Sequence, residues 1–353
     1  MKFIESVYAK LQRHPKRIVF PEGTEPRVLH AAAEFVKLKL GAPLLLGNRT
    51  EIERLAKREK IDISRIGIID PTTASDLPLF CQRLSKLQRY RNLGVGEAES
   101  FLRNPNYFAA MMIQHGQADA LVGGASGYAG SLMRPLFQLV KPLPEISFIS
   151  SCMAMALKDD RFGENGVLFF ADCAVIPEPT VAQLAHIGVQ AGKLCGQLTG
   201  ARPRVAFLSF STKGSSKHAS PEKMAAAAAQ ARKEAELEEM YIEIDGELQA
   251  DTALLPELAA LKSPNSLVAG QANVLIFPDL NAGNIAVKLV EHLAGAEAYG
   301  QILLGLSKPC ADLSRGASVE TIVGAAAIVG LQAIEYRKLY PPDGSEDQIE
   351  VVV

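Results

Sequence analysis

The chain has 353 residues, and a prior of roughly 150 residues per domain predicts about two domains. Hydrophobic residues make up 48% of the chain, and the net charge of −2 argues against nucleic-acid binding through bulk positive charge. The longest apolar runs, such as residues 324–331, fall short of the roughly 20 residues that span a bilayer. The N-terminus, with Glu5 early, does not read as a signal peptide. We therefore expect a cytoplasmic protein.

The cysteines are scattered and contain no Cys-x-x-Cys spacing, so neither a disulfide framework nor a zinc site is predicted. Most of them are expected to be small buried hydrophobic residues. The six histidines show no ligand spacing either, and we expect no metal site. The five cysteines are Cys81, Cys152, Cys173, Cys195 and Cys310.

In the first half of the chain, short apolar runs alternate with helical patterns. Thr24 is expected to cap the helix that follows the first strand. Regular alternation of strands and helices predicts an α/β fold with mostly parallel sheets and helices on both faces. The strands are expected at residues 17–20, 43–46, 66–69 and 120–122.

The second half repeats this pattern, with a solvated helix at 224–240 and another helix at 319–334. A domain boundary is placed near residue 147. In open α/β sheets, ligands bind beyond the carboxyl ends of the strands, so the strand exits are the candidate sites. The strands of this half are expected at residues 167–170, 204–208, 240–244, 273–277 and 302–306.

Two strand exits carry glycines or hydroxyls that suit an anion. Gly123–Tyr128 precedes a helix with Arg134, and its glycines let backbone amides approach an anion; the alternative is a tight structural turn. Residues 209–217 combine hydroxyls, a glycine and two lysines, which suits phosphate or carboxylate groups, although a polar surface loop remains the alternative. This second loop lacks the Walker A pattern.

Two further exits carry amides or a guanidinium. In residues 277–284, Asp, Asn and Gly favour turns and caps, and paired asparagines can also bind a ligand amide. The acidic run at 245–251 is not claimed as a metal site. In residues 308–318, the turn Ser314-Arg315-Gly316 at a helix start joins a hydroxyl, free amides and a guanidinium that matches phosphate oxygens, with Ser318 as the helix cap.

Together these four segments resemble the phosphate acetyltransferase/phosphate butyryltransferase family, over nearly the whole chain. The most specific match is Asp312-Leu313-Ser314-Arg315-Gly316. The resemblance implies an isocitrate-dehydrogenase-like fold with an interdomain cleft, one domain at 1–147 plus 302–353 and the other at 148–301. It also implies a homodimer, reversible acetyl transfer between coenzyme A and phosphate, and no cofactor beyond coenzyme A as substrate. Further matching segments are 20–22, 106–112, 170–172, 245–249 and 298–300.

The resemblance assigns roles to residues that match the family pattern. Ser314 and Arg315 would be catalytic, the serine as a donor to the carbonyl or phosphate oxygen and the arginine as a phosphate ligand. Since a free thiol has a pKa of about 8.5, the thiol of coenzyme A needs a base or local positive charge in the reverse direction. Residues Arg134, Arg89 and Tyr128 would bind phosphate or acyl phosphate, and Ser211, Thr212, Lys213 and Asn284 would bind coenzyme A.

The sequence also departs from the family pattern. The acid usual seven positions after the motif serine is here Thr321, a poor base, which leaves Glu320 and Asp312 as alternative acids. Ala317 replaces the usual cysteine, and the run at 126–130 differs, which alters the predicted pocket. The further family arginine aligns with Arg89 or with Arg91. Two alternative functions follow: transfer of a longer acyl group, or binding of coenzyme A or an anion with little turnover.

Overall fold

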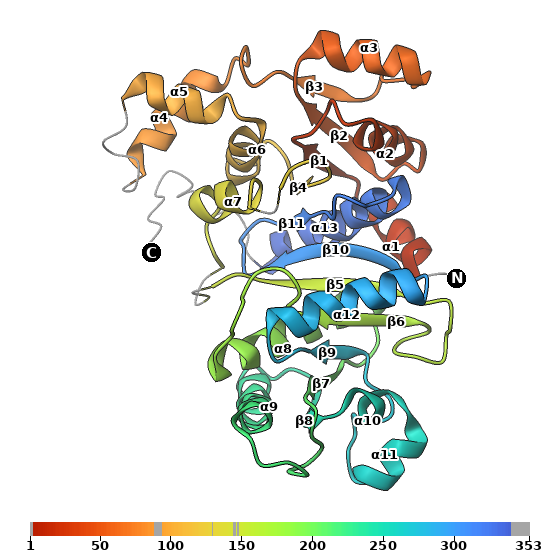
Figure 1. Ribbon diagram of the computed structural model, residues 1–353. Helices are drawn as coiled ribbons and strands as arrows, with labels where there is room; N and C mark the ends of the chain where they lie inside the picture. Colours follow the sequence, from red (N-terminus) through yellow and green to blue (C-terminus); the bar gives the residue numbers. More distant parts are fainter. Residues whose placement is uncertain (1–2, 88–93, 129, 144–145, 147, 340–353) are drawn as a thin grey trace. The chain divides into compact units, whose positions relative to one another are not determined.

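The computed structural model describes residues 3–87, 94–128, 130–143, 146 and 148–339 (Figure 1). The chain divides into two compact units: Met1–Ile146 with Leu306–Val353, and Ser147–Gly305. The sequence predicts that the chain returns to the first domain at residue 302. In the structure the strand that ends at Leu304 pairs antiparallel with a strand at 150–156, so it belongs to the second unit.

The first unit alternates strands with helices, as the sequence predicts. Its elements are α1 (Phe3–Gln12), β1 (Lys16–Phe20), α2 (Pro26–Lys37), β2 (Gly41–Leu46), α3 (Arg49–Glu59), β3 (Gly67–Ile69), α4 (Leu77–Lys86), α5 (Val95–Leu102), α6 (Pro105–Gln114), β4 (Ala120–Gly123), α7 (Met133–Leu139), β11 (Cys310–Asp312) and α13 (Val319–Leu339).

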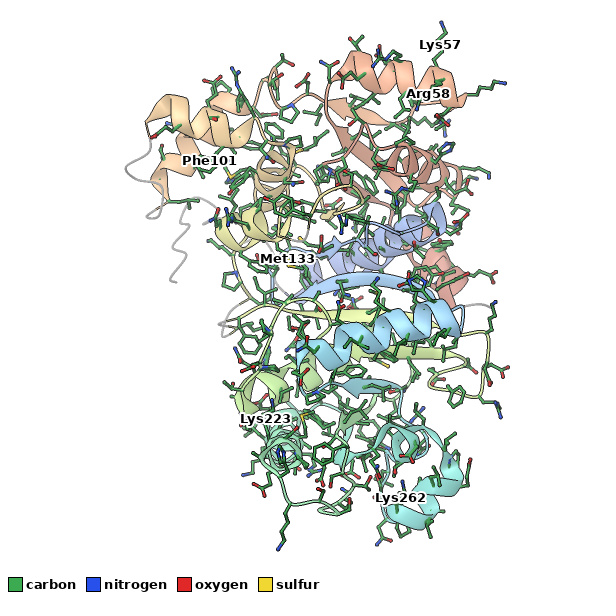
Figure 2. The ribbon with its side chains drawn as sticks, in the orientation of Figure 1. Lys57, Arg58, Phe101, Met133, Lys223 and Lys262 are labelled. Atoms are coloured by element: carbon green, nitrogen blue, oxygen red, sulfur yellow. The ribbon has the colours of Figure 1, made fainter. Side chains whose placement is uncertain are left out.

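The strands of this unit are parallel, in the order β3-β2-β1-β4-β11. α13 packs against α1, α2 and β4, and it is buried along most of its described length. Within α13, Val319–Tyr336 has the length and mean hydropathy (1.3) of a membrane span, but 67% of it is buried inside the protein. Charged side chains such as Lys57 and Arg58 point away from α3 into solvent (Figure 2).

The second unit contains a mixed sheet in the order β10-β5-β6-β9-β7-β8. β6, β9, β7 and β8 are parallel to one another, whereas β5 is antiparallel to both of its neighbours, so the predicted mostly parallel α/β class is confirmed with an antiparallel insertion. The elements are β5 (Ser150–Ala156), β6 (Val167–Ala171), α8 (Val181–Thr199), β7 (Arg204–Leu208), α9 (Ala219–Leu237), β8 (Glu243–Leu248), α10 (Ala250–Leu254), α11 (Pro256–Lys262), β9 (Val274–Ile276), α12 (Leu280–Leu293) and β10 (Glu297–Leu304).

Three sequence-based expectations are corrected. The expected strand at 240–244 lies further along as β8, because buried Asp245 and Glu247 belong to the strand. The run at 302–306 ends β10, and it is the short β11 that leads into the Ser-Arg-Gly turn. The cap of α2 is Glu25, whose carboxylate accepts the N–H of Arg27, in place of Thr24.

Candidate active site

Three strand exits of the first unit lie side by side. β4 pairs with both β1 and β11, and Asp312 is in register with Gly123. Because the strands are parallel, their carboxyl ends meet at one edge of the sheet. The backbone N–H of Leu313 donates to the carbonyl of Gly123 at 2.7 Å, which ties the Ser-Arg-Gly turn to the glycine turn after β4.

The glycine turn after β4 already holds an anion, the carboxylate of Glu22 from the exit of β1. Glu22 accepts hydrogen bonds from the backbone N–H groups of Ala125 (2.7 Å), Ser126 (2.8 Å) and Gly127 (3.0 Å). The Ser126 hydroxyl donates to it as well, at 2.8 Å. These bonds favour the alternative of a structural turn, because a side chain of the same chain occupies the three amides.

Arg27, in the first turn of α2, connects the two turns. Its guanidinium donates to the carbonyl of Ala125 at 2.8 Å, and to the carbonyls of Arg315 and Ala317 at 2.8 and 2.9 Å. Glu25 orients the same guanidinium through a bond of 2.8 Å to Nε. One planar cation with several donors thus fixes both turns at once. Sequence reasoning missed this role, and only the adjacency of the β1 and β4 exits could have indicated it.

In the Ser-Arg-Gly turn, Ser314 is half-buried and Arg315 is exposed. The Ser314 hydroxyl accepts the N–H of Gly316 at 3.3 Å. The Arg315 guanidinium makes no hydrogen bond to another side chain or backbone group of the described residues. An exposed guanidinium and a half-buried hydroxyl on adjacent residues suit the oxygens of a phosphate group.

The start of α13 confirms the predicted cap, since the Ser318 hydroxyl accepts the N–H of Thr321 at 3.2 Å. The Thr321 hydroxyl in turn donates to the carbonyl of Ser318 at 3.1 Å. Hydrogen bonds from its own backbone N–H and from Ser318 lower the pKa of the exposed Glu320. Burial, with a contribution from Glu22, raises the pKa of Asp312 to about 7.

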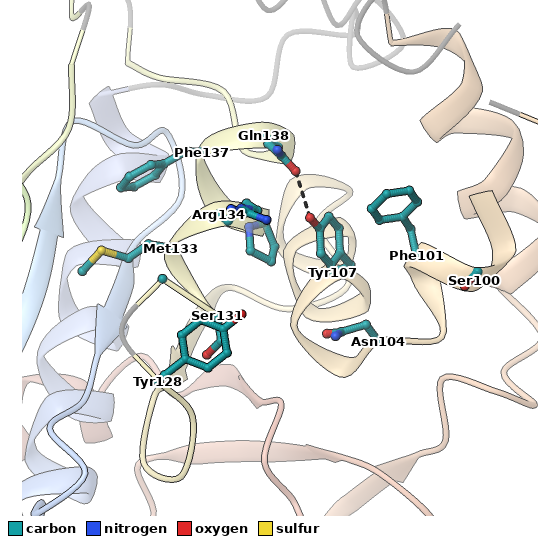
Figure 3. Close-up of a pocket in the computed structure, with 12 residues that line it drawn as sticks. Ser100, Phe101, Asn104, Tyr107, Tyr128, Ser131, Met133, Arg134, Phe137 and Gln138 are labelled. Atoms are coloured by element: carbon teal, nitrogen blue, oxygen red, sulfur yellow. Dashed lines mark hydrogen bonds between the residues drawn. The ribbon is translucent and has the colours of Figure 1, made fainter. Parts of the chain in front are cut away.

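Arg134 and Tyr128 line one cavity of about 860 Å³ in the first unit (Figure 3). Arg134 projects from α7, and its guanidinium has no hydrogen-bond partner among the described residues. Opposite it, Tyr107 of α6 donates to the Gln138 amide oxygen at 3.0 Å, and burial raises the pKa of Tyr107. Phe101 of α5 adds an apolar wall. The predicted Arg89 and its alternative Arg91 lie outside the described residues.

In the second unit, the predicted loop for coenzyme A turns its hydroxyls into the protein. Ser211 is fully buried and donates to Glu247 at 2.9 Å. Thr212 is 6% exposed, and its hydroxyl accepts the N–H of Gln249 at 3.0 Å. Both hydroxyls therefore support the loop itself, and the expectation that they face a ligand has no support in their contacts.

The remaining two predicted ligands of coenzyme A also have internal partners. Lys213 pairs with Asp245, yet its side chain is 41% exposed. Asp245 contacts Arg232 as well, at 3.4 Å. Asn284, in the first turns of α12, donates to the carbonyl of Cys173 at 3.1 Å. Of these four side chains, Lys213 is the one that combines a charge with clear exposure.

No group of three or more potential metal ligands is found among the described residues. All five cysteines are free and buried, as expected for small hydrophobic residues. Burial raises the pKa of the Cys195 thiol to about 12 and that of the Cys310 thiol further still. These thiols are therefore poor nucleophiles, since the thiolate is the reactive form.

Comparison with known proteins places this chain in a family. A family model described as phosphate acetyl/butaryl transferase matches residues 2–330. A phosphate acetyltransferase of Thermoanaerobacterium thermosaccharolyticum is 44% identical over 94% of this chain and 100% of its own length. A second, from Acetivibrio thermocellus, is 40% identical over 94% and 98% of the two chains.

Solved structures agree with this assignment. Phosphotransacetylases from Staphylococcus aureus and Streptococcus pyogenes each align with a TM-score of 0.84 and 36% identity, over 94% of this chain and 98% of theirs. A putative 4-hydroxythreonine-4-phosphate dehydrogenase from Salmonella typhimurium, at 13% identity and a TM-score of 0.51, shares the fold alone. The dehydrogenase-like α/β fold expected from the sequence is thereby confirmed. The chain belongs to the phosphate acetyl/butaryl transferase family.

Proposed function

We propose that the protein is a phosphate acetyltransferase, which transfers an acetyl group reversibly between coenzyme A and inorganic phosphate. Curated relatives at 38–44% identity are named for this activity. The observation that carries the proposal is the turn after β11, which presents the exposed Arg315 guanidinium and the half-buried Ser314 hydroxyl, and whose backbone carbonyls at Arg315 and Ala317 are bound by Arg27.

The chemistry requires three things of the site. Phosphate must be held while one of its oxygens attacks the thioester carbonyl, and the guanidiniums of Arg315 and Arg134 suit that task. The carbonyl oxygen gains negative charge as the tetrahedral intermediate forms, and the Ser314 hydroxyl can donate to it. The thiol of coenzyme A then leaves. Because every cysteine is buried and Ala317 stands in the turn, direct transfer between two bound substrates is favoured over an acyl-cysteine intermediate.

The first prediction is that acetyl-CoA releases free thiol only when phosphate is present. A dye that reports free thiols measures the rate over a range of phosphate concentrations, with omission of phosphate as the control. Phosphate-independent release, or none at all, would contradict the proposal. The same assay with propionyl- and butyryl-CoA tests the alternative of a longer acyl group, for which the apolar Phe101 and Met133 in the cavity wall would provide contacts.

We also propose that Lys213 contacts a phosphate of coenzyme A, while Ser211, Thr212 and Asn284 shape the loop and helix around it. Lys213→Gln is expected to raise the KM for coenzyme A several-fold and to leave kcat unchanged, because the charge aids binding equally in ground and transition states. Unfolding stability should fall by no more than about 1 kcal/mol, since Arg232 still pairs with Asp245.

The matched control is Lys193→Gln, which removes an exposed lysine that pairs with Glu238. It should leave the KM for coenzyme A unaltered. An equal rise in both variants would show a general charge effect and would remove Lys213 from the binding site.

The assembly implied by the family resemblance and the location expected from the sequence are part of the same proposal. We expect a homodimer that acts in the cytoplasm. Sedimentation equilibrium at micromolar concentration should give twice the chain mass, and a single-chain mass at all concentrations would reject the dimer.

A further inference from the structure

The reaction moves a proton to or from the sulfur of coenzyme A, and the helix that follows the motif offers no suitable base for it. Thr321 has no carboxylate, and its hydroxyl is engaged with the carbonyl of Ser318 at 3.1 Å. Glu320 is exposed, and hydrogen bonds lower its pKa. A carboxylate with a lowered pKa is poorly matched to a thiol of pKa about 8.5.

The Asp312 carboxyl differs from that of Glu320 because it is buried. It is the last residue of β11, two positions before Ser314, and it is 9% exposed. No hydrogen bond to its side chain is made within the described residues. Buried polar groups almost always have a partner, so a carboxyl without one points to a role outside the folding of the unit itself.

Gly124, in the neighbouring turn after β4, leaves room for the Asp312 carboxyl because it has no side chain. A Cβ atom on Gly124 would lie 2.3 Å from Oδ1 of Asp312, and the φ of +96° at Gly124 disfavours any side chain. The Asp312 carboxyl therefore lies directly against the backbone at the exit of β4. Its environment is set by that turn and by the exit of β1.

The charged groups around Asp312 leave it without a counter-ion. Glu22, on the β1 side, adds a negative charge, and its carboxylate is fully engaged by the amides of the glycine turn. Arg27, on the α2 side, directs its guanidinium to backbone carbonyls and to Glu25. Burial and the nearby Glu22 together raise the pKa of Asp312 to about 7.

We propose that Asp312 is the group that exchanges a proton with the sulfur of coenzyme A in this chain. In the direction that consumes coenzyme A, the Asp312 carboxylate takes the S–H proton, the sulfur forms a bond to the acetyl carbon, and the bond from that carbon to the phosphate oxygen breaks. In the other direction, the phosphate oxygen attacks the acetyl carbon, the C–S bond breaks, and protonated Asp312 returns its proton to sulfur. The inference rests on the proposed acetyltransferase function.

The two directions should therefore depend on pH in opposite senses. Synthesis of acetyl-CoA from acetyl phosphate needs ionised Asp312, so kcat/KM should rise as the pH passes through about 7. Formation of acetyl phosphate needs protonated Asp312, so its kcat/KM should carry a component that falls over the same range. Titrations of the substrates themselves are common to wild type and variants, and a comparison of profiles isolates the residue.

Asp312→Asn should lower kcat by roughly 10²- to 10⁴-fold in both directions, the range for loss of a general acid or base, and should remove both pH-dependent components. The control is Glu320→Gln, which removes the exposed acid in the first turn of α13 and should retain both pH-dependent components. The Asn variant is expected to fold. Because the pKa of Asp312 is raised in the folded state, its protonation contributes to the free energy of unfolding at low pH, and this contribution is lost as the pH rises through about 7. The substitution should therefore not lower the free energy of unfolding above that pH.

A second measurement does not depend on turnover. The infrared difference spectrum between wild type and Asp312→Asn should show a protonated carboxyl band that disappears as the pH rises through about 7. A band already absent at pH 5, or pH profiles unchanged by the substitution in an active enzyme, would overturn the assignment of Asp312 alone. Lack of phosphate-dependent thiol release by wild type would overturn the function as well.

Discussion

Substitution of Arg315 by alanine should lower kcat/KM for phosphate by about 10²- to 10³-fold, the range seen when one charged or polar group that stabilises a transition state is removed. The guanidinium is exposed and has no partner among the described residues, so it is available to a substrate anion. Stability should be nearly unchanged, because it is the carbonyl of Arg315 that Arg27 holds. Steady-state kinetics with varied phosphate, together with urea unfolding, checks both parts.

Arg315→Lys provides the matched control for this prediction. Lysine keeps the charge but loses the fork that binds two phosphate oxygens at once, so its activity should lie between that of wild type and that of the alanine variant. An Arg315→Ala enzyme with an unaltered dependence on phosphate would remove this residue from the site.

Substitution of Arg27 by alanine should reduce both stability and turnover. Its guanidinium donates to the carbonyls of Ala125, Arg315 and Ala317, which belong to two different turns. Hydrogen bonds of charged groups contribute about 1.5–3 kcal/mol, and partial exposure places the expected loss of unfolding free energy near the lower end, at about 2 kcal/mol. Because Ser314 loses its support, kcat should fall at least 10-fold, as small displacements of positioned groups are costly.

The controls for Arg27 separate its effect on the position of the two turns from its effect on the stability of the fold. Arg27→Lys keeps a cation but cannot reach three carbonyls at once, so it should restore stability more than turnover. A comparable loss of stability elsewhere in the first unit, as in Ile18→Ala in the core of β1, should spare kcat in the fraction that remains folded. If Arg27→Ala lowered stability and left kcat intact, its role would be purely structural.

Much of the fold was open to prediction from the sequence because most of its strands are continuous apolar runs. β1, β6 and β7 coincide with their predicted ranges to within a residue. β8 was displaced because its polar side chains find partners that no hydropathy pattern can show, such as Lys213 with Asp245. β5 was missed because its seven residues, SSCMAMA, lack the β-branched and aromatic side chains that favour a strand.

The motif residues of the candidate site could be predicted from the sequence, whereas the residues that hold its turns in place could not. Ser314 and Arg315 stand out because a serine, an arginine and a glycine precede a capped helix. Glu22 and Arg27 act through backbone groups of distant turns, and such contacts depend on which strands are neighbours, which one sequence does not reveal. For the same reason, the buried contacts of the Ser211 hydroxyl could not be separated from ligand contacts.

The central claim is acyl transfer to phosphate, and its most direct test follows the phosphorus atom. Acetyl-CoA and inorganic phosphate are incubated with the enzyme, and phosphorus NMR is recorded while free thiol is measured in the same sample. The account predicts an acetyl phosphate signal that grows in equal amount to the free thiol and is strongly reduced with Arg315→Ala. Thiol release without acetyl phosphate would show hydrolysis in place of transfer and would contradict the account.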